Sequence, residues 1–251
     1  GYTVFSSSPF AGCIELATIG CSTSTILPFA ELVTSNTGRG PNPLLQNHPL
    51  MAIHPPMLYI GYVGMTMPFV AATSRLYSKK EDSNSWIEVA EKTTYIPWLF
   101  LTIGITLGAA WSYEVLGWGG YWAWDPVENV SFIPWLLATA FLHSAKIQKT
   151  QNTLLNWNYI LVGLMFLSTL FGTFITRSGV LISVHAFSNG NIGTYLLFGM
   201  LLFGLIFIGI GSKNIEYFSK SKKIDNWFGK SGFFVYNNIF LFSSALVVFI
   251  G

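Results

Sequence analysis

Residues 192–212 read IGTYLLFGMLLFGLIFIGIGS and contain no charged side chain. A helix rises about 1.5 Å per residue, so a helix of this length crosses the roughly 30 Å hydrocarbon core of a bilayer. Backbone polar groups inside a bilayer must be satisfied within the segment, which makes such a run helical. The stretch therefore predicts a membrane-spanning helix.

The rest of the chain repeats this pattern. Only 10% of the 251 residues are charged, whereas a soluble domain usually carries about a quarter. We predict an all-α polytopic transmembrane helical bundle of about six spans. We divide the chain into an outer-face N-terminal segment, 1–56, and a membrane domain, 57–251. The five further apolar runs are 57–73, 95–113, 131–147, 155–175 and 232–250.

The basic residues predict the orientation of these spans. All but two of the 13 Lys and Arg lie in alternate connections between the runs, which together define a basic face. By the positive-inside rule this face is the cytoplasm or the mitochondrial matrix. Only Arg39 and Arg177 lie toward the opposite, outer face. The net charge of +2 is too small to indicate a nucleic-acid partner. The basic face carries Arg75, Lys79, Lys80, Lys92, Lys146, Lys149, Lys213, Lys220, Lys222, Lys223 and Lys230.

One outer loop, 114–130, is crowded with aromatic residues and reads GWGGYWAWDPVEN over 117–129. Tryptophans often anchor proteins at the membrane interface, but such residues are scattered over many helix ends. Crowding beside two glycines favours a platform for a planar apolar ligand, because glycine permits close approach and aromatic faces give stiff contact area. Asp125 either orients a polar edge of the ligand or caps the helix that begins at Pro126. The candidate residues are Trp118, Gly119, Gly120, Trp122, Trp124 and Asp125.

Two histidines flank this loop on the same face. His54 precedes the first run and His185 follows the fourth. Imidazole is a standard axial ligand of haem iron, so the pair is a candidate clamp for a haem whose edge rests on the aromatic platform. The alternative is that each histidine merely hydrogen-bonds a loop. We interpret the nearby His48 as an ordinary loop residue.

A third candidate ligand, His143, lies inside the run 131–147. A titratable residue within a span is costly and is a functional candidate. From Ser131 to His143 a helix rises about 18 Å, so His143 cannot share an iron with His54 and His185. It would serve a second site with a ligand from another helix. The alternative is a helix-end histidine beside Lys146 that reaches toward the interface.

Three motifs resemble the CcmF family of cytochrome c haem lyase subunits: WGGYWAWDPVEN at 118–129, HPPMLYIGYVG at 54–64 and TRSGVLISVHAF at 176–187. The first is similar to the tryptophan-rich WWD signature of haem-handling proteins, and the resemblance runs from about Pro41 to the end. It implies that His54 and His185 bracket a haem substrate at the WWD loop. It also implies that His143 is one of two ligands of a resident b-type haem, whose second ligand has no match here.

The resemblance further implies a function in cytochrome c maturation. Haem delivered by a CcmE-type chaperone would be attached to the thiols of an apocytochrome c, with a CcmH-type thiol partner and, if the gene is split, other CcmF fragments. The chain has no C-x-x-C-H motif and is not itself a c-type cytochrome. The alternatives are a membrane haem carrier without lyase chemistry and a structural subunit. We expect the protein to be located in the mitochondrial inner membrane, with the bacterial plasma membrane as the alternative.

Overall fold

The computed structural model describes residues 12–16, 20–24, 48–78, 85–115, 120–178, 180–181, 192–224 and 226–251. The chain divides into two compact units, 1–43 and 44–251. In the first unit, strand β1 (Gly12–Leu16) pairs antiparallel with β2 (Gly20–Ser24), with Cys13 opposite Thr23. This hairpin was not among the elements predicted from the sequence. The predicted division at residue 56 separates an outer-face segment from the membrane domain, whereas the two compact units are defined by internal contacts. The division at residue 56 therefore stays a prediction.

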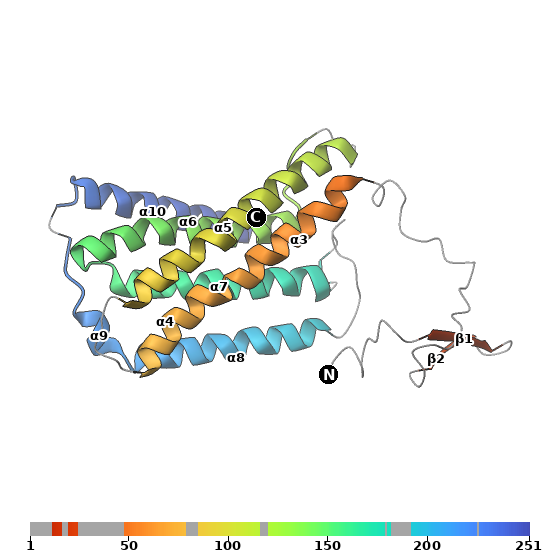
Figure 1. The fold of residues 1–251 in the computed structure, drawn as a ribbon, viewed down its shortest axis with the longest axis horizontal. Helices are drawn as coiled ribbons and strands as arrows, with labels where there is room; N and C mark the ends of the chain where they lie inside the picture. The colour runs from red at the N-terminus through yellow and green to blue at the C-terminus, as the bar shows by residue number, and fades with distance from the viewer. Residues whose placement is uncertain are drawn as a thin grey trace. The chain divides into compact units, whose positions relative to one another are not determined.

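The second unit is helical, and the predicted all-α bundle is confirmed for it (Figure 1). Six helical stretches in the described residues are long and apolar enough to cross a membrane, and each contains one of the predicted runs. A short helix, α9, lies between the last two. The helices are α3 (Pro49–Gly64), α4 (Thr66–Ser78), α5 (Ser85–Val115), α6 (Pro126–Gln151), α7 (Leu155–Ser178), α8 (Ile192–Ser212), α9 (Ile215–Ser219) and α10 (Lys230–Ile250).

The first span is longer than the apolar run predicts and is interrupted. It extends from Pro49 to Ser78, with a break at Met65 between α3 and α4. Pro68 has no N–H to donate to the carbonyl of Gly64, four residues earlier, so the helical ladder loses a bond at this point. Because α3 begins before the predicted run, His54 lies inside a helix instead of in the loop ahead of one.

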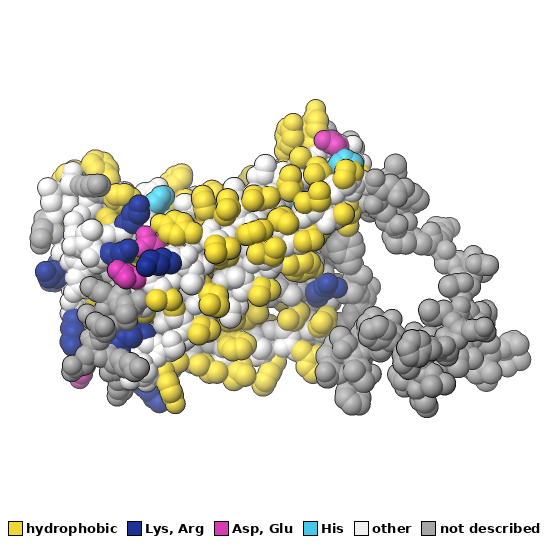
Figure 2. Space-filling model, viewed as in Figure 1, with side chains coloured by type: hydrophobic (Ala, Val, Ile, Leu, Met, Phe, Trp, Pro, Cys, Tyr) yellow, Lys and Arg dark blue, Asp and Glu magenta, His cyan; other side chains and the backbone are white. Residues whose placement is uncertain are grey.

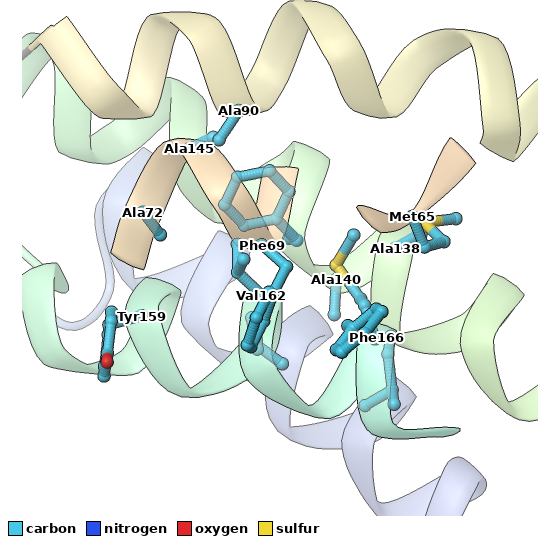
Figure 3. Packing of buried hydrophobic residues seen from close by; sticks show 14 of the residues in the cluster. Met65, Phe69, Ala72, Ala90, Ala138, Ala140, Ala145, Tyr159, Val162 and Phe166 are labelled. Atoms are coloured by element: carbon cyan, nitrogen blue, oxygen red, sulfur yellow. The ribbon is translucent and has the colours of Figure 1, made fainter. Parts of the chain in front are cut away.

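Helix α6 is the centre of the bundle. Its most apolar window is 72% buried, whereas the windows of α8 and α10 are only 11% buried and leave their side chains for lipid or other chains. Small residues on α6 let neighbouring helices approach closely, as is common in membranes. Phe69 of α4 stacks on Phe166 of α7 with ring centroids 4.3 Å apart. Figure 3 shows this packing around Ala138, Ala140 and Ala145, all fully buried.

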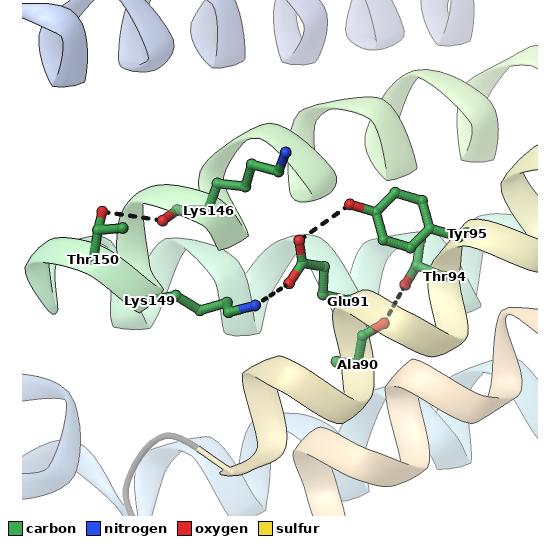
Figure 4. Close-up of polar contacts among 7 residues, drawn as sticks. All are labelled: Ala90, Glu91, Thr94, Tyr95, Lys146, Lys149 and Thr150. Atoms are coloured by element: carbon green, nitrogen blue, oxygen red, sulfur yellow. Dashed lines mark hydrogen bonds and ion pairs between the residues drawn. The ribbon is translucent and has the colours of Figure 1, made fainter.

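Polar side chains join α5 to α6 at two levels. Near the middle, Trp98 donates to Thr139 at 2.9 Å and Trp135 donates to Thr102 at 2.8 Å, so each helix supplies one donor and one acceptor. Near the basic face, Lys149 forms an ion pair of 2.8 Å with the buried carboxylate of Glu91 (Figure 4). These contacts fix the register of the two helices whose outer ends border the aromatic loop.

Basic side chains gather at one end of the bundle, while hydrophobic side chains cover its length (Figure 2). The described members of the basic face lie in the terminal turns of spans or in the connections beyond them, in keeping with the charge pattern of the sequence. The chain is a multi-pass membrane protein by its helices. Its orientation remains a prediction from the positive-inside rule.

Labelling tests the orientation. With Cys13 and Cys21 replaced by Ser, Lys222→Cys should react with a membrane-impermeant maleimide applied only from the cytoplasmic or matrix side. Tyr121→Cys, at the opposite end of the spans, is the matched control and should react only from the other side. Reaction of position 222 from the outer side alone would reverse the assignment of the two faces.

Candidate functional site

A cavity lies at the outer ends of α3, α5, α6 and α7, beside the aromatic loop. The empty space in it and in its open mouth amounts to about 990 Å³, part of which is bulk solvent. Its walls are mainly apolar, with a few polar groups. The lining residues are Met51, His54, Pro55, Leu58, Tyr59, Tyr62, Gly104, Ile105, Gly108, Ala109, Trp111, Trp122, Val127, Glu128, Ser131, Thr173, Thr176 and Arg177.

His54 is a buried wall of this cavity, with 6% of the residue exposed. Its Nδ1 lies 2.7 Å from the carbonyl oxygen of Leu50, one turn earlier in α3. A carbonyl only accepts, so Nδ1 carries a proton and donates it to Leu50; in the neutral form of such a ring the lone pair is on Nε2. Metal-binding histidines are usually held in this way by a backbone carbonyl. The ring also packs against Trp111 with centroids 5.5 Å apart.

Glycines on α5 make room for this wall. A Cβ on Gly108 would lie 3.3 Å from Cδ2 of His54, and one on Gly104 would lie 2.8 Å from a methyl carbon of Leu58. Larger residues at either position would push α3 away from α5. Pro55 and Pro56 follow His54 inside α3 and lack N–H groups, so the helix is locally weakened next to the histidine. The local sequence thus holds the imidazole between two closely packed helices.

The aromatic loop contributes one indole to the cavity. Trp122 lines it, whereas Trp124 is absent from the lining and is 62% exposed. The two rings meet edge to face with centroids 6.2 Å apart. Trp124 has a φ of 59°, a left-handed conformation that non-glycine residues rarely adopt. Such a conformation costs on the order of 1–3 kcal/mol, and it turns the chain between the two indoles.

Asp125 caps α6, the second of the two roles considered for it. Its carboxylate accepts from the N–H of Val127 at 3.1 Å. Glu128 reaches back and accepts from the N–H of Asp125 at 3.3 Å and from that of Ala123 at 2.9 Å. This reciprocal capping box fixes the loop on the helix end. Glu128 also lines the cavity, so the cap positions the cavity wall.

Trp122 has a polar group without a partner. Its indole N–H is buried and has no hydrogen-bond acceptor in the part of the chain that the structure describes. A buried donor left without an acceptor is rare and calls for an explanation. Phe132 of α6 supports the same indole edge to face, with centroids 5.8 Å apart. A ligand with a polar edge in the cavity would supply the acceptor.

The cavity includes tyrosines and a cation that the sequence analysis did not select. Tyr62 donates to the carbonyl of Val130 at 3.2 Å, and a Cβ on Gly172 would lie 2.7 Å from its hydroxyl. Arg177 lies 3.4 Å from the hydroxyl of Tyr59. Arg177 is one of only two basic residues that lie off the basic face in the sequence pattern, and this unusual position could have identified it as a candidate site residue. Both tyrosines lie in the motif HPPMLYIGYVG, but neither was selected as a site residue.

His143 lies apart from this cavity. Its Nδ1 is 2.8 Å from the amide nitrogen of Asn237 on α10, and its ring meets Phe234 edge to face. Ser131, which lines the cavity, is twelve residues earlier on α6, or about 18 Å of helix. Among the described residues no group of three or more His, Cys, Asp or Glu side chains is close enough to hold a metal ion.

Three of the predicted site residues, Trp118, Gly119 and His185, lie outside the described residues. Gly120 lies in the aromatic loop and is described, but it does not line the cavity. His48, interpreted as a loop residue, is the N-cap of α3, and its Nε2 lies 2.8 Å from Glu114 at the end of α5.

Residues 4–182 match the family model described as "Cytochrome C assembly protein". The chain is 40% identical over 96% of its length to "Cytochrome c-type biogenesis protein ccl1" of Rhodobacter capsulatus, and 39% identical over 85% to CcmF of Escherichia coli. It covers 37% and 33% of those two proteins. The solved structure "Cytochrome c Heme Lyase CcmF" is 41% identical and superposes with a TM-score of 0.67 over 82% of this chain and 31% of that one. The chain thus spans about a third of the length of these relatives.

Proposed function

The chain belongs to the cytochrome c assembly protein family, and on that basis we propose that it holds haem in the outer cavity while haem is attached to apocytochrome c. One observation carries the proposal most directly: the buried His54 and the half-buried Trp122 line the same cavity. In the proposal the chain is one part of a cytochrome c haem lyase and acts together with other chains.

The residues of the cavity fit haem chemically. Haem is a flat apolar ring with an iron at its centre and carboxylates on one edge, and the cavity offers mainly apolar walls. His54 would supply Nε2 to one face of the iron, with its tautomer set by Leu50. The unpartnered N–H of Trp122 and the cation of Arg177 would meet the carboxylate edge. His185, outside the described residues, is proposed as the ligand of the opposite face.

In this function haem is the substrate, and the chain needs no nucleophile. Each thiol of the apocytochrome adds its sulfur and its hydrogen across one vinyl group, so a C–S bond forms without any oxidant. The contribution of the chain is to hold the ring in one orientation and to exclude water from it. Trp122 and Glu128 line one wall, whose position is fixed by the cap on α6, and Phe132 packs against the Trp122 indole.

His143 is proposed as a ligand of a resident b-type haem, distinct from the substrate. For this role the side-chain amide of Asn237 would have to rotate by half a turn, so that its oxygen and not its nitrogen faces Nδ1 of His143. Nδ1 would then donate and Nε2 would be left to bind iron. The second ligand would come from another polypeptide or from a further part of the protein.

The partners follow from the same proposal. They are a CcmE-type haem chaperone, a CcmH-type thiol partner, the apocytochrome and other CcmF fragments if the gene is split. The proposed location is the mitochondrial inner membrane, with the bacterial plasma membrane as the alternative.

Substitution of the two indoles tests the cavity. Trp122→Ala should lower the yield of covalently haem-stained cytochrome c several-fold, because it removes a wall of the cavity. Trp124→Ala is the matched control: it removes an equal ring from the same loop but none of the lining, so its effect should be smaller. Trp122→Phe should give an intermediate yield, since it keeps aromatic area and loses the N–H.

The cytochrome c yield, together with copurification and bound haem, separates the rival functions. Normal cytochrome c yield in Trp122→Ala, with the protein inserted at its usual level, would contradict the proposal. Copurification of the chain with apocytochrome c is expected for a lyase subunit and argues against a carrier. Loss of bound haem without loss of the assembled complex would point to a structural subunit.

A further inference from the structure

A second pocket, which unlike the outer cavity is polar, lies at the opposite end of the bundle, between the α6–α7 connection and the start of α10. The described residues around it are neutral polar side chains and two lysines, with no carboxylate among them. The site is independent of the outer cavity and of haem. The lining residues are Gln151, Thr153, Lys222, Lys223, Asn226, Gly229 and Ser231.

The pocket is built from two loops that are joined by hydrogen bonds. The N–H of Lys222 donates to the carbonyl of Asn152 at 2.9 Å, and the hydroxyl of Ser221 accepts from the N–H of Leu155 at 3.4 Å. Ser231 donates to the side chain of Gln151 at 2.8 Å and ties the start of α10 to the end of α6. The arrangement is therefore a fixed part of the fold.

Two features of the pocket indicate that it is suited to bind an anion. The N-cap of α10 is Gly229, which provides no side-chain cap, so the first-turn N–H groups present the positive end of the helix dipole. Thr153 is only 2% exposed, and its hydroxyl has no hydrogen-bond partner in the part of the chain that the structure describes. A buried hydroxyl without a partner beside a helix N-terminus suits an acceptor with several oxygens.

The lysines supply the opposite charge. Lys222 and Lys223 are exposed, and neither forms an ion pair with a described carboxylate, whereas Lys149 nearby is already paired with Glu91 (Figure 4). Basic pockets between membrane helices on this face are typical sites for anionic lipid headgroups.

An apolar groove continues from the same two lysines along α7. It is lined by Leu154, Trp157, Ile160 and Trp227 besides Lys222 and Lys223. Ile160 and Trp227 are 37% and 49% exposed, so the groove presents apolar surface next to the polar pocket. A free phosphate would use the pocket alone, whereas a phospholipid would use both.

We propose that this composite site binds an anionic phospholipid. Its phosphate would lie between Lys222, Lys223 and the N-terminus of α10, within reach of Thr153, and an acyl chain would follow the groove past Trp157. The lipid would join the α6–α7 connection to α10, the helix that also contacts His143 through Asn237.

Native mass spectrometry of the full chain, purified with its partner chains, tests the site. Detergent-solubilised complex would be equilibrated with phosphatidylglycerol or phosphatidylcholine, and the retained lipid counted. Lys222→Gln with Lys223→Gln should lower phosphatidylglycerol retention by about 10- to 30-fold, as expected for two charges near the surface. Lys213→Gln with Lys220→Gln removes equal charge from the same face outside the pocket and should retain the lipid. Thr153→Val, nearly equal in shape, should lower retention without altering the fold.

Each other outcome overturns the proposal. If both double-lysine variants lose phosphatidylglycerol to the same extent, the lipid is attracted by the general surface charge and not by the pocket. Phosphatidylcholine carries the same phosphate together with a quaternary ammonium, so its equal retention would mean that the site does not recognise the net negative charge of the lipid. Displacement of phosphatidylglycerol by an equal concentration of inorganic phosphate would identify a free-phosphate site in which the groove has no part. If the Lys222 and Lys223 variant does not insert, retention by Thr153→Val equal to that of the unaltered protein overturns the proposal.

Discussion

His54→Ala is expected to remove most of the haem held at the outer face and to stop cytochrome c maturation. The imidazole is buried in the cavity wall, and because Nδ1 donates to Leu50, Nε2 is the nitrogen that we propose binds iron. Loss of a group that merely orients a metal ligand typically costs 10–100-fold in metal affinity, so loss of the ligand itself should cost at least about that much. The measurement is haem bound to the purified complex, together with the yield of haem-stained cytochrome c.

Two further variants separate ligation from folding. His48→Ala removes the N-cap of the same helix, which costs about 1 kcal/mol, but it removes no proposed ligand, so bound haem should persist. His54→Gly creates a space that added imidazole can fill, and haem binding should then recover in part. Unchanged haem in His54→Ala, or recovery in His54→Gly without imidazole, would show that His54 does not bind the iron.

The fold was largely predictable because lipid imposes one rule on every span. An uncharged apolar run such as 192–212 has to become a helix, and α8 has those bounds. Helix ends were less predictable, because they depend on capping and not on hydropathy. The first span begins at Pro49, where His48 caps it, and includes polar and proline residues that a hydropathy count excludes.

Residues of the cavity were predictable where their chemistry was unusual and unpredictable where their place in it depended on packing. His54 and Trp122 stood out by type and position, and they line one cavity. Trp124 looked equivalent to Trp122 in sequence, yet a left-handed φ turns the chain between them. Tyr62 and Gly108 join the cavity only because α3 packs against α5 and α7, which no local pattern encodes.

Separate substitutions at His143 and His185 should remove two different haems. His143 bonds to Asn237 on α10 and lies about 18 Å of helix from the cavity residue Ser131, so one iron cannot serve both places. His143→Ala should therefore abolish the spectrum of a resident b-type haem and leave haem trapped with the chaperone at the outer face. His185→Ala should disturb the outer site first and leave the resident haem in place.

The haem spectrum of each variant, purified with its partner chains, distinguishes these results. His143→Gln accompanies His143→Ala, because it keeps a hydrogen-bonding group for Asn237 and so keeps the α6–α10 contact while lacking an imidazole. A resident haem lost in both variants, with normal protein levels, identifies His143 as a ligand. A haem lost in His143→Ala but retained in His143→Gln means that the histidine only holds the two helices together. If His143→Ala and His185→Ala remove the same single haem, the two-site proposal fails, since the geometry of α6 leaves no way for both residues to reach one iron.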